Sequence, residues 1–159
     1  MTHNSIIIED IPRDMLRLGW FSTGRGPGSR NLLKAVMDKK EQGELDIEIS
    51  FVFCNWDNDE EDNPKREQRQ IFFDMVKGYG IPLVTLSWKR FMPELWKEDQ
   101  TAWRNEYGKE LRRLTGQYPF DLGILAGYML WMDDETCREY DMLNLHPAPV
   151  SYTHLRAHE

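Results

Sequence analysis

Short apolar runs alternate with amphipathic stretches along most of this chain. Runs of this kind predict five strands, at 16–22, 46–54, 81–86, 120–127 and 142–145. Apolar residues at a spacing of three and four predict helices between them, at 29–43, 65–79, 101–116 and 133–140. We expect 88–100 to be irregular, with Pro93 as a breaker. Strands separated by helices favour an open, mostly parallel α/β sheet with helices on both faces.

The first predicted strand runs directly into a glycine-rich segment. Leu16–Ser22 is followed by Thr23–Gly28, which holds three glycines and a proline in six positions. This composition predicts a loop. Ser29 stands where a helix N-cap is expected, ahead of the apolar stripe of the first helix.

Composition limits the class of protein. The 159 residues are 40% hydrophobic, with 27 acidic and 20 basic side chains and a net charge of -7, which is typical of one globular domain. No apolar run reaches the roughly 18 residues of a membrane span, and no secretion signal is recognisable, so we expect a cytoplasmic protein without membrane partners. Cys54 and Cys137 lack zinc or disulfide spacing. The acidic balance disfavours nucleic acid as a partner.

The two ends of the chain differ from its centre. Val150–Glu159 resembles the translation of a sequencing-library adapter, and we exclude it, with His154 and His158, from fold and function. We therefore expect three segments: an extension at 1–15 in which 5–8 could form an edge strand, a domain at 16–149, and a non-native tail at 150–159. On this interpretation the natural sequence was cut near Pro149.

Two further patterns receive structural interpretations. Asn55–Pro64 is rich in carboxylates but lacks the Gly and the final Glu of a calcium loop, so we expect a solvated loop. Trp103, Tyr107, Leu111 and Leu114 recur at helical spacing. They are most simply core residues, because no basic groove accompanies them for stacking on nucleic-acid bases.

Unusual chemistry is concentrated at the ends of two predicted strands. In open α/β sheets, ligands bind at the carboxyl ends of the strands. The glycine loop offers backbone N–H groups beside a helix N-terminus, which suits a phosphate, although it matches neither the dinucleotide nor the Walker fingerprint. At the end of the last strand, the Asn144 amide can donate to an oxyanion, and His146 can move a proton near neutral pH.

These segments together resemble the folate-dependent formyltransferase family. The resemblance rests on Asp121–Met129, on Asn144-Leu145-His146-Pro147 and on Gly28-Ser29-Arg30-Asn31-Leu32, and it covers most of 16–149. It implies a Rossmann-like fold of the formyltransferase N-terminal type, incomplete at its C-terminus. It also implies transfer of a formyl group from 10-formyltetrahydrofolate, as co-substrate, to the amine of a phosphorylated small molecule, glycinamide ribonucleotide in purine biosynthesis.

The resemblance also assigns roles to residues. Asn144 and His146 match the family's catalytic pair, which stabilises the tetrahedral oxyanion and assists proton movement. The phosphate and ribose of the acceptor would contact a set from the glycine loop: Gly26, Gly28, Ser29 and Asn31. The folate pocket would be lined by the end of the fourth strand and one residue of the fifth: Leu125, Ala126, Gly127, Tyr128, Met129 and Leu143. No metal is implied.

Three departures from the family pattern qualify these roles. Arg30 is inserted between Ser29 and Asn31, and Leu130 replaces a common Arg. The family's catalytic aspartate would lie beyond Pro149, so we expect little activity from this chain.

Alternatives stay open at this point. The acceptor could be an aminosugar nucleotide, methionyl-tRNA or water, the last giving a deformylase. A Rossmann-like oxidoreductase module with Asn55 and Asp57 near the ribose is also possible, although it leaves Asn144 and His146 unexplained.

Overall fold

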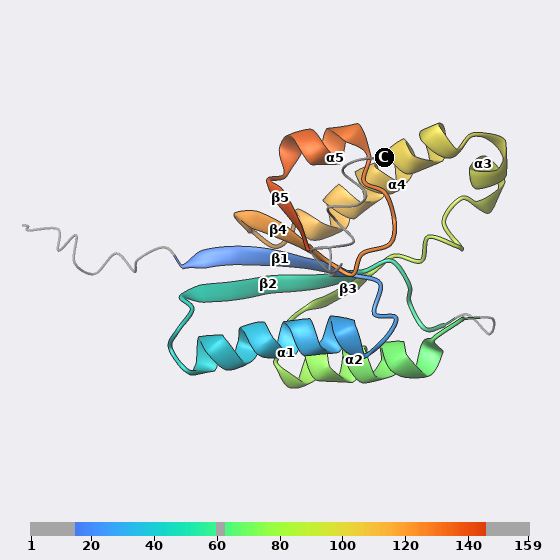
Figure 1. The fold of residues 1–159 in the computed structure, drawn as a ribbon. Coiled ribbons are helices and arrows are strands. Elements are labelled where there is room, and N and C mark those ends of the chain that lie inside the picture. The colour runs from blue at the N-terminus through green and yellow to red at the C-terminus, as the bar shows by residue number, and fades with distance from the viewer. Residues whose placement is uncertain (1–14, 60–62, 146–159) are drawn as a thin grey trace, which may run out of the picture.

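The computed structural model describes residues 15–59 and 63–145, and these form one sheet with helices on both faces (Figure 1). The strands are β1 (Leu16–Ser22), β2 (Ile47–Cys54), β3 (Leu83–Thr85), β4 (Leu122–Ala126) and β5 (Met142–Leu145). The helices are α1 (Pro27–Glu41), α2 (Arg66–Gly78), α3 (Pro93–Glu98), α4 (Gln100–Thr115) and α5 (Asp134–Glu139). All five predicted strands are confirmed.

The sheet is parallel throughout, in the order β3-β2-β1-β4-β5. The chain fills one half of the sheet with β2 and β3, then returns past β1 to add β4 and β5. The order therefore reverses between β1 and β4. In a doubly wound sheet, this reversal opens a crevice at the carboxyl ends of the two strands. The fold is the Rossmann-like α/β fold that the sequence indicated.

Each face of the sheet packs its own core. Alternating side chains of β2 enter both: Val52 and Cys54 pack beneath α1 and α2, whereas Phe51 and Phe53 pack beneath α4 (Figure 1). Trp103, Tyr107 and Leu111 of α4 are buried in the second core, with Leu114 packed against it. This confirms the structural interpretation of that aromatic stripe.

Two local predictions are wrong. Residues 88–100 are not irregular throughout, because Pro93 begins α3 at a position where a missing N–H costs nothing. Ser29 is not the N-cap of the first helix. Gly26 holds that position and Pro27 begins α1, so Gly28 and Ser29 belong to the first helical turn. The proposed tail, the possible edge strand at 5–8 and residues 146–149 lie outside the described residues.

Candidate active site at the carboxyl edge

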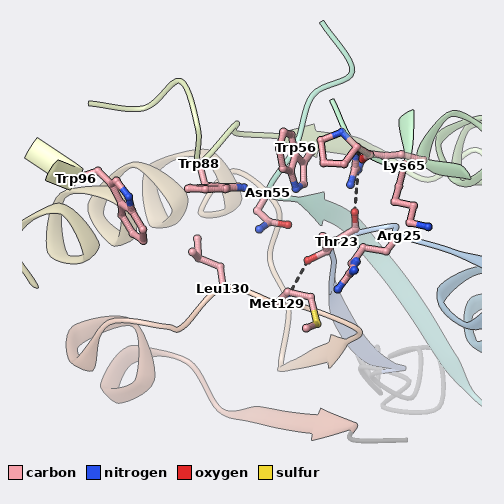
Figure 2. Close-up of a pocket in the computed structure, with 11 residues that line it drawn as sticks. Thr23, Arg25, Asn55, Trp56, Lys65, Trp88, Trp96, Met129 and Leu130 are labelled. Atoms are coloured by element: carbon pink, nitrogen blue, oxygen red, sulfur yellow. Dashed lines mark hydrogen bonds between the residues drawn. The ribbon is translucent and has the colours of Figure 1, made fainter. Parts of the chain in front are cut away.

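Thr23 fastens the loops after β1 and β4 to each other. Its backbone N–H donates to the Gly127 carbonyl at 3.0 Å, and its Oγ1 accepts from the Met129 N–H at 2.9 Å (Figure 2). Thr23 is itself buried. At the strand reversal, the loops after β1 and β4 are therefore joined by two hydrogen bonds of Thr23.

The predicted acceptor residues gather in one groove beside these loops. A cavity of about 680 Å3, which we call the glycine groove, is lined by segments of α1 and by the ends of β4 and β5: Gly26, Gly28, Ser29, Asn31, Leu32, Ala35, Ala126, Gly127 and Leu145. Four of these residues were predicted to hold the acceptor and two to line the folate pocket. Its size lies within the range of about 300–1,000 Å3 that small-molecule sites occupy.

The N-terminus of α1 opens on this groove. Gly26 supplies no side chain to cap the helix, and the first turn contains no acidic residue. The first N–H groups of a helix lack intrahelical partners and carry partial positive charge. This end of the groove can therefore hold an anion.

The inserted Arg30 is directed to a neighbouring helix. Its Nη1 donates to Gln68 Oε1 at 2.6 Å, so the side chain bridges α1 to α2. The insertion thus falls within a helical turn and leaves Ser29 and Asn31 on the wall of the same groove.

Asn144 lies in β5, paired with Leu125 of β4, and its side chain is exposed. Because side chains alternate along a strand, Asn144 shares a face with Met142, while Leu143 shares the other face with Leu145. Met142 packs against the core beneath α4, and Leu145 against the core beneath α1. His146 lies outside the described residues.

The predicted folate residues are divided between the two faces. Leu125 and Tyr128 pack against the core beneath α4, and Ala126 is fully buried on the other side. Met129 and Leu143 are 61% and 50% exposed. The side chains of Met129 and Leu143 and the backbone around Gly127 are thus the groups of this set that a ligand can contact directly.

A second pocket at this edge was missed from the sequence. It has a volume of about 370 Å3 and lies among the ends of β1 and β2, the start of α2, the segment from 88 into α3, and the segment after β4 (Figure 2). We call it the tryptophan pocket, and it is lined by Thr23, Arg25, Asn55, Trp56, Pro64, Lys65, Arg69, Trp88, Trp96, Met129 and Leu130. The sequence feature that could have indicated this pocket is the polar pair Thr23 and Asn55, because each residue directly follows a buried strand.

A buried arginine supports the wall between these loops. Arg69 of α2 is 1% exposed, donates from Nε to the Thr23 carbonyl at 2.9 Å, and lies 4.9 Å from the ring centroid of Trp56. Cys54 Sγ donates to the same carbonyl at 3.6 Å. Burial raises the pKa of this thiol to about 12, so it is protonated at neutral pH.

Two further properties concern the described residues alone. Within residues 15–59 and 63–145, no three His, Cys, Asp or Glu side chains are grouped so that they could hold a metal ion. None of the helices in these ranges has the length and apolarity that crossing a membrane requires.

The fold places the chain in a recognisable class: a doubly wound Rossmann-like sheet with its candidate site at the β1–β4 crevice. No family model and no curated protein sequence matches it. Solved structures do match, and those described below are formyltransferases, which confirms at the level of fold the resemblance noted in the sequence.

Three of these structures show the extent of the likeness. Phosphoribosylglycinamide formyltransferase from Coxiella burnetii matches with a TM-score of 0.58 and 21% identity over 91% of this chain and 61% of its own. The enzyme from Campylobacter jejuni gives 0.55 and 23%, over 85% and 60%. Glycinamide ribonucleotide transformylase 1 from Symbiobacterium toebii gives 0.55 and 19%, over 86% and 53%. The chain thus spans between about half and three fifths of the length of each.

Proposed function

We propose that this chain carries the acceptor-binding part of a folate-dependent formyltransferase. Its reaction would move the formyl group of 10-formyltetrahydrofolate to the amine of a phosphorylated small molecule, with glycinamide ribonucleotide as the acceptor. The observation that carries the proposal is the glycine groove. It joins Gly28, Ser29 and Asn31 at the positive end of α1 to Leu145 at the end of β5, and the Asn144 side chain is exposed on the other face of that strand, at the same carboxyl edge.

The groove supports a division of roles along its length. The acceptor phosphate would lie at the N-terminus of α1, where free N–H groups favour an anion. The amine would then extend toward the end of β5. Asn144 would donate from its side-chain amide to the oxyanion that forms when the amine attacks the formyl carbon. A donor placed in this way typically contributes about 3 kcal/mol to transition-state stabilisation.

His146 would assist the proton transfer that completes the reaction. As the new C–N bond forms and the bond from the formyl carbon to N10 breaks, one proton must leave the attacking amine and one must reach N10. An imidazole with a pKa near neutrality can mediate this transfer. This role rests on the Asn-x-His-Pro sequence motif.

The residues present fit the folate in part. Met129 and Leu143 offer exposed apolar surface on either side of the carboxyl edge, while Leu125 and Tyr128 are already packed. We therefore assign the folate to the rim near Met129 and Asn144.

Binding of the acceptor tests the proposal independently of turnover. Isothermal titration of the 159-residue chain with glycinamide ribonucleotide should give a complex that Ser29→Ala and Asn31→Ala weaken, while Asn105→Ala in α4 leaves it unchanged. Failure to bind, equal effects of all three variants, or preferential binding of NAD would contradict the acceptor assignment.

Turnover tests the catalytic roles. In the gene product that contains this sequence, formyl transfer followed by the absorbance of the released tetrahydrofolate should fall at least about a hundredfold in Asn144→Ala and in His146→Ala. Circular dichroism of each variant establishes that the fold is retained. Turnover within twofold of the wild type in either variant would remove that residue from the mechanism.

A further inference from the structure

The tryptophan pocket shares no lining residue with the glycine groove. Its walls come from four segments, and Figure 2 shows Trp88 and Trp96 on one side with Leu130 across from them. Trp88 makes edge contacts with both Trp56 and Trp96, at centroid distances of 5.8 and 5.4 Å. This end of the pocket is a rigid aromatic surface suited to a flat ring.

The opposite end of the pocket is basic. Arg25 and Lys65 both line it there (Figure 2). Both are exposed, and neither side chain has an ion-pair partner in the part of the chain that the structure describes. In a protein with a net charge of -7, two cations at one pocket mouth favour an anionic group.

Lys65 also holds a strained backbone position. Its φ of 65° is left-handed, and it stands at the N-cap of the 13-residue helix α2, which no side chain caps. A residue other than glycine in this conformation costs about 1–2 kcal/mol. Such strain is concentrated at ligand-binding sites. Here it brings a cation and a helix N-terminus to the same side of the pocket.

Asn55 supplies the third feature, between the aromatic and basic ends (Figure 2). It is 2% exposed, yet its Oδ1 has no hydrogen-bond partner among the residues that the structure describes. A buried acceptor without a partner costs about 1–3 kcal/mol. Rotation of the amide would turn this oxygen to a ligand N–H and remove that cost.

We propose that the tryptophan pocket is a second ligand site, for a nitrogen heterocycle that carries an anionic group. A purine nucleoside monophosphate has this chemistry. Its ring would pack against Trp88 and Leu130, an exocyclic N–H would donate to Asn55, and its phosphate would lie at Arg25 and Lys65. The volume of about 370 Å3 suits one such molecule and is small for an extended one.

The pocket provides its own spectroscopic reporter, since three tryptophans line it. Titration of the 159-residue chain with AMP should change tryptophan fluorescence saturably. Adenosine and ribose 5-phosphate, which lack the anion and the ring respectively, should each bind at least about tenfold more weakly. Equal binding of ribose 5-phosphate would overturn the proposed role of the ring, and equal binding of adenosine would overturn that of the anion.

Variants locate the site. Arg25→Gln and Lys65→Gln should each raise the Kd for AMP about tenfold, whereas Lys77→Gln, exposed at the other end of α2, should leave it unchanged. Asn55→Leu should weaken the binding of AMP, and circular dichroism of this variant should show that the fold is retained. If it does not fold, the Arg25 and Lys65 results decide.

Three outcomes would overturn the proposal. These are the absence of a saturable signal, the same Kd in Lys65→Gln and Lys77→Gln, or displacement of AMP by a folate but not by GMP. The last result would assign the pocket to the formyl donor. The site is separable from the proposed reaction, because Asn144→Ala should leave AMP binding intact.

Discussion

Gly127 and Ser29 approach each other so closely that a Cβ on Gly127 would lie 3.0 Å from Ser29 Oγ. Gly127 also has a φ of 68°, which L side chains rarely adopt. The end of β4 and the first turn of α1 therefore meet through a position that requires glycine.

Gly127→Ala should destabilise the chain by about 1–2 kcal/mol through its backbone alone. It should also displace Ser29 and weaken binding of glycinamide ribonucleotide. Urea denaturation and isothermal titration measure the two effects. Gly28→Ala is the control for stability, because Gly28 lies in the first turn of α1 without a positive φ and a Cβ there has no neighbour within 4 Å. Equal stability of the two variants would contradict the prediction.

Arg69→Met should lower the free energy of unfolding by about 3 kcal/mol. The substitution leaves the buried carbonyl of Thr23 without its charged donor and removes the bond from Arg69 Nη1 to the Pro64 carbonyl, 3.2 Å away. Arg69→Lys should recover less than half of this loss, since a single ammonium cannot reproduce the fork of the guanidinium. Arg66→Met, exposed on the same helix, should cost under about 0.5 kcal/mol. A cost for Arg69→Met no larger than that of Arg66→Met would show that the arginine does not support the rim.

Gly108→Ala should be among the more damaging single-methyl additions in this chain. Its Cβ would lie 2.0 Å from Asp133 Oδ1, and Asp133 is 4% exposed and held by Arg112 at 2.9 Å. Overpacking of this kind costs about 1–3 kcal/mol. Gly78→Ala in α2 meets nothing within 4 Å and should instead stabilise by up to about 1 kcal/mol. Thermal unfolding of both variants should shift Tm in opposite directions, and shifts of the same sign would count against this packing.

Cys54 should make stability fall at alkaline pH. Its thiol has a pKa of about 12 in the fold and an ordinary value of 9.0 when exposed. Below pH 9 both states are protonated and the thiol contributes no pH dependence. Between pH 9 and 12 the unfolded chain releases the proton and the folded chain does not, so unfolding is favoured by up to about 1.4 kcal/mol per pH unit.

Cys54→Ala should therefore show a shallower loss of stability from pH 9 to 10.5 than the wild type, although it is less stable overall. Urea denaturation at several pH values gives both slopes. Cys137→Ala, at an exposed position, should change the slope less. Parallel curves for the wild type and Cys54→Ala would mean that the buried thiol ionises in the folded protein.

Periodicity predicted the strands and most helices because each buries a regular pattern. β2 begins with alternating burial and ends fully buried, as its sequence indicates. Rules for helix starts failed at α1, where Ser29 and Gly26 are both possible N-cap residues. Ser29 has the better capping chemistry, but Pro27 can start a helix two residues earlier and leaves the cap to Gly26. Pro93 was read as a breaker, although a first-turn position suits proline equally well.

The candidate site was predictable where it follows one strand and not where it joins several. The residues of the glycine groove came from motifs at single strand ends. The tryptophan pocket combines Trp56 and Trp88 from two loops with Trp96 of α3 and Leu130 of a third loop, and no spacing in the sequence brings these together. Division of Leu125 and Leu143 between opposite faces likewise depends on sheet register, which the individual strands do not encode.

The hydrogen bonds of Thr23 affect how ligands enter the tryptophan pocket. Its amide and hydroxyl both bond to the segment after β4, and its carbonyl accepts a bond from Arg69 of α2, so a single residue after β1 ties these two segments together. Admission to the tryptophan pocket then depends on rotation of outward side chains such as Met129, a fast motion compared with loop opening. Association rates should accordingly be set by diffusion and charge, with no slow gating phase.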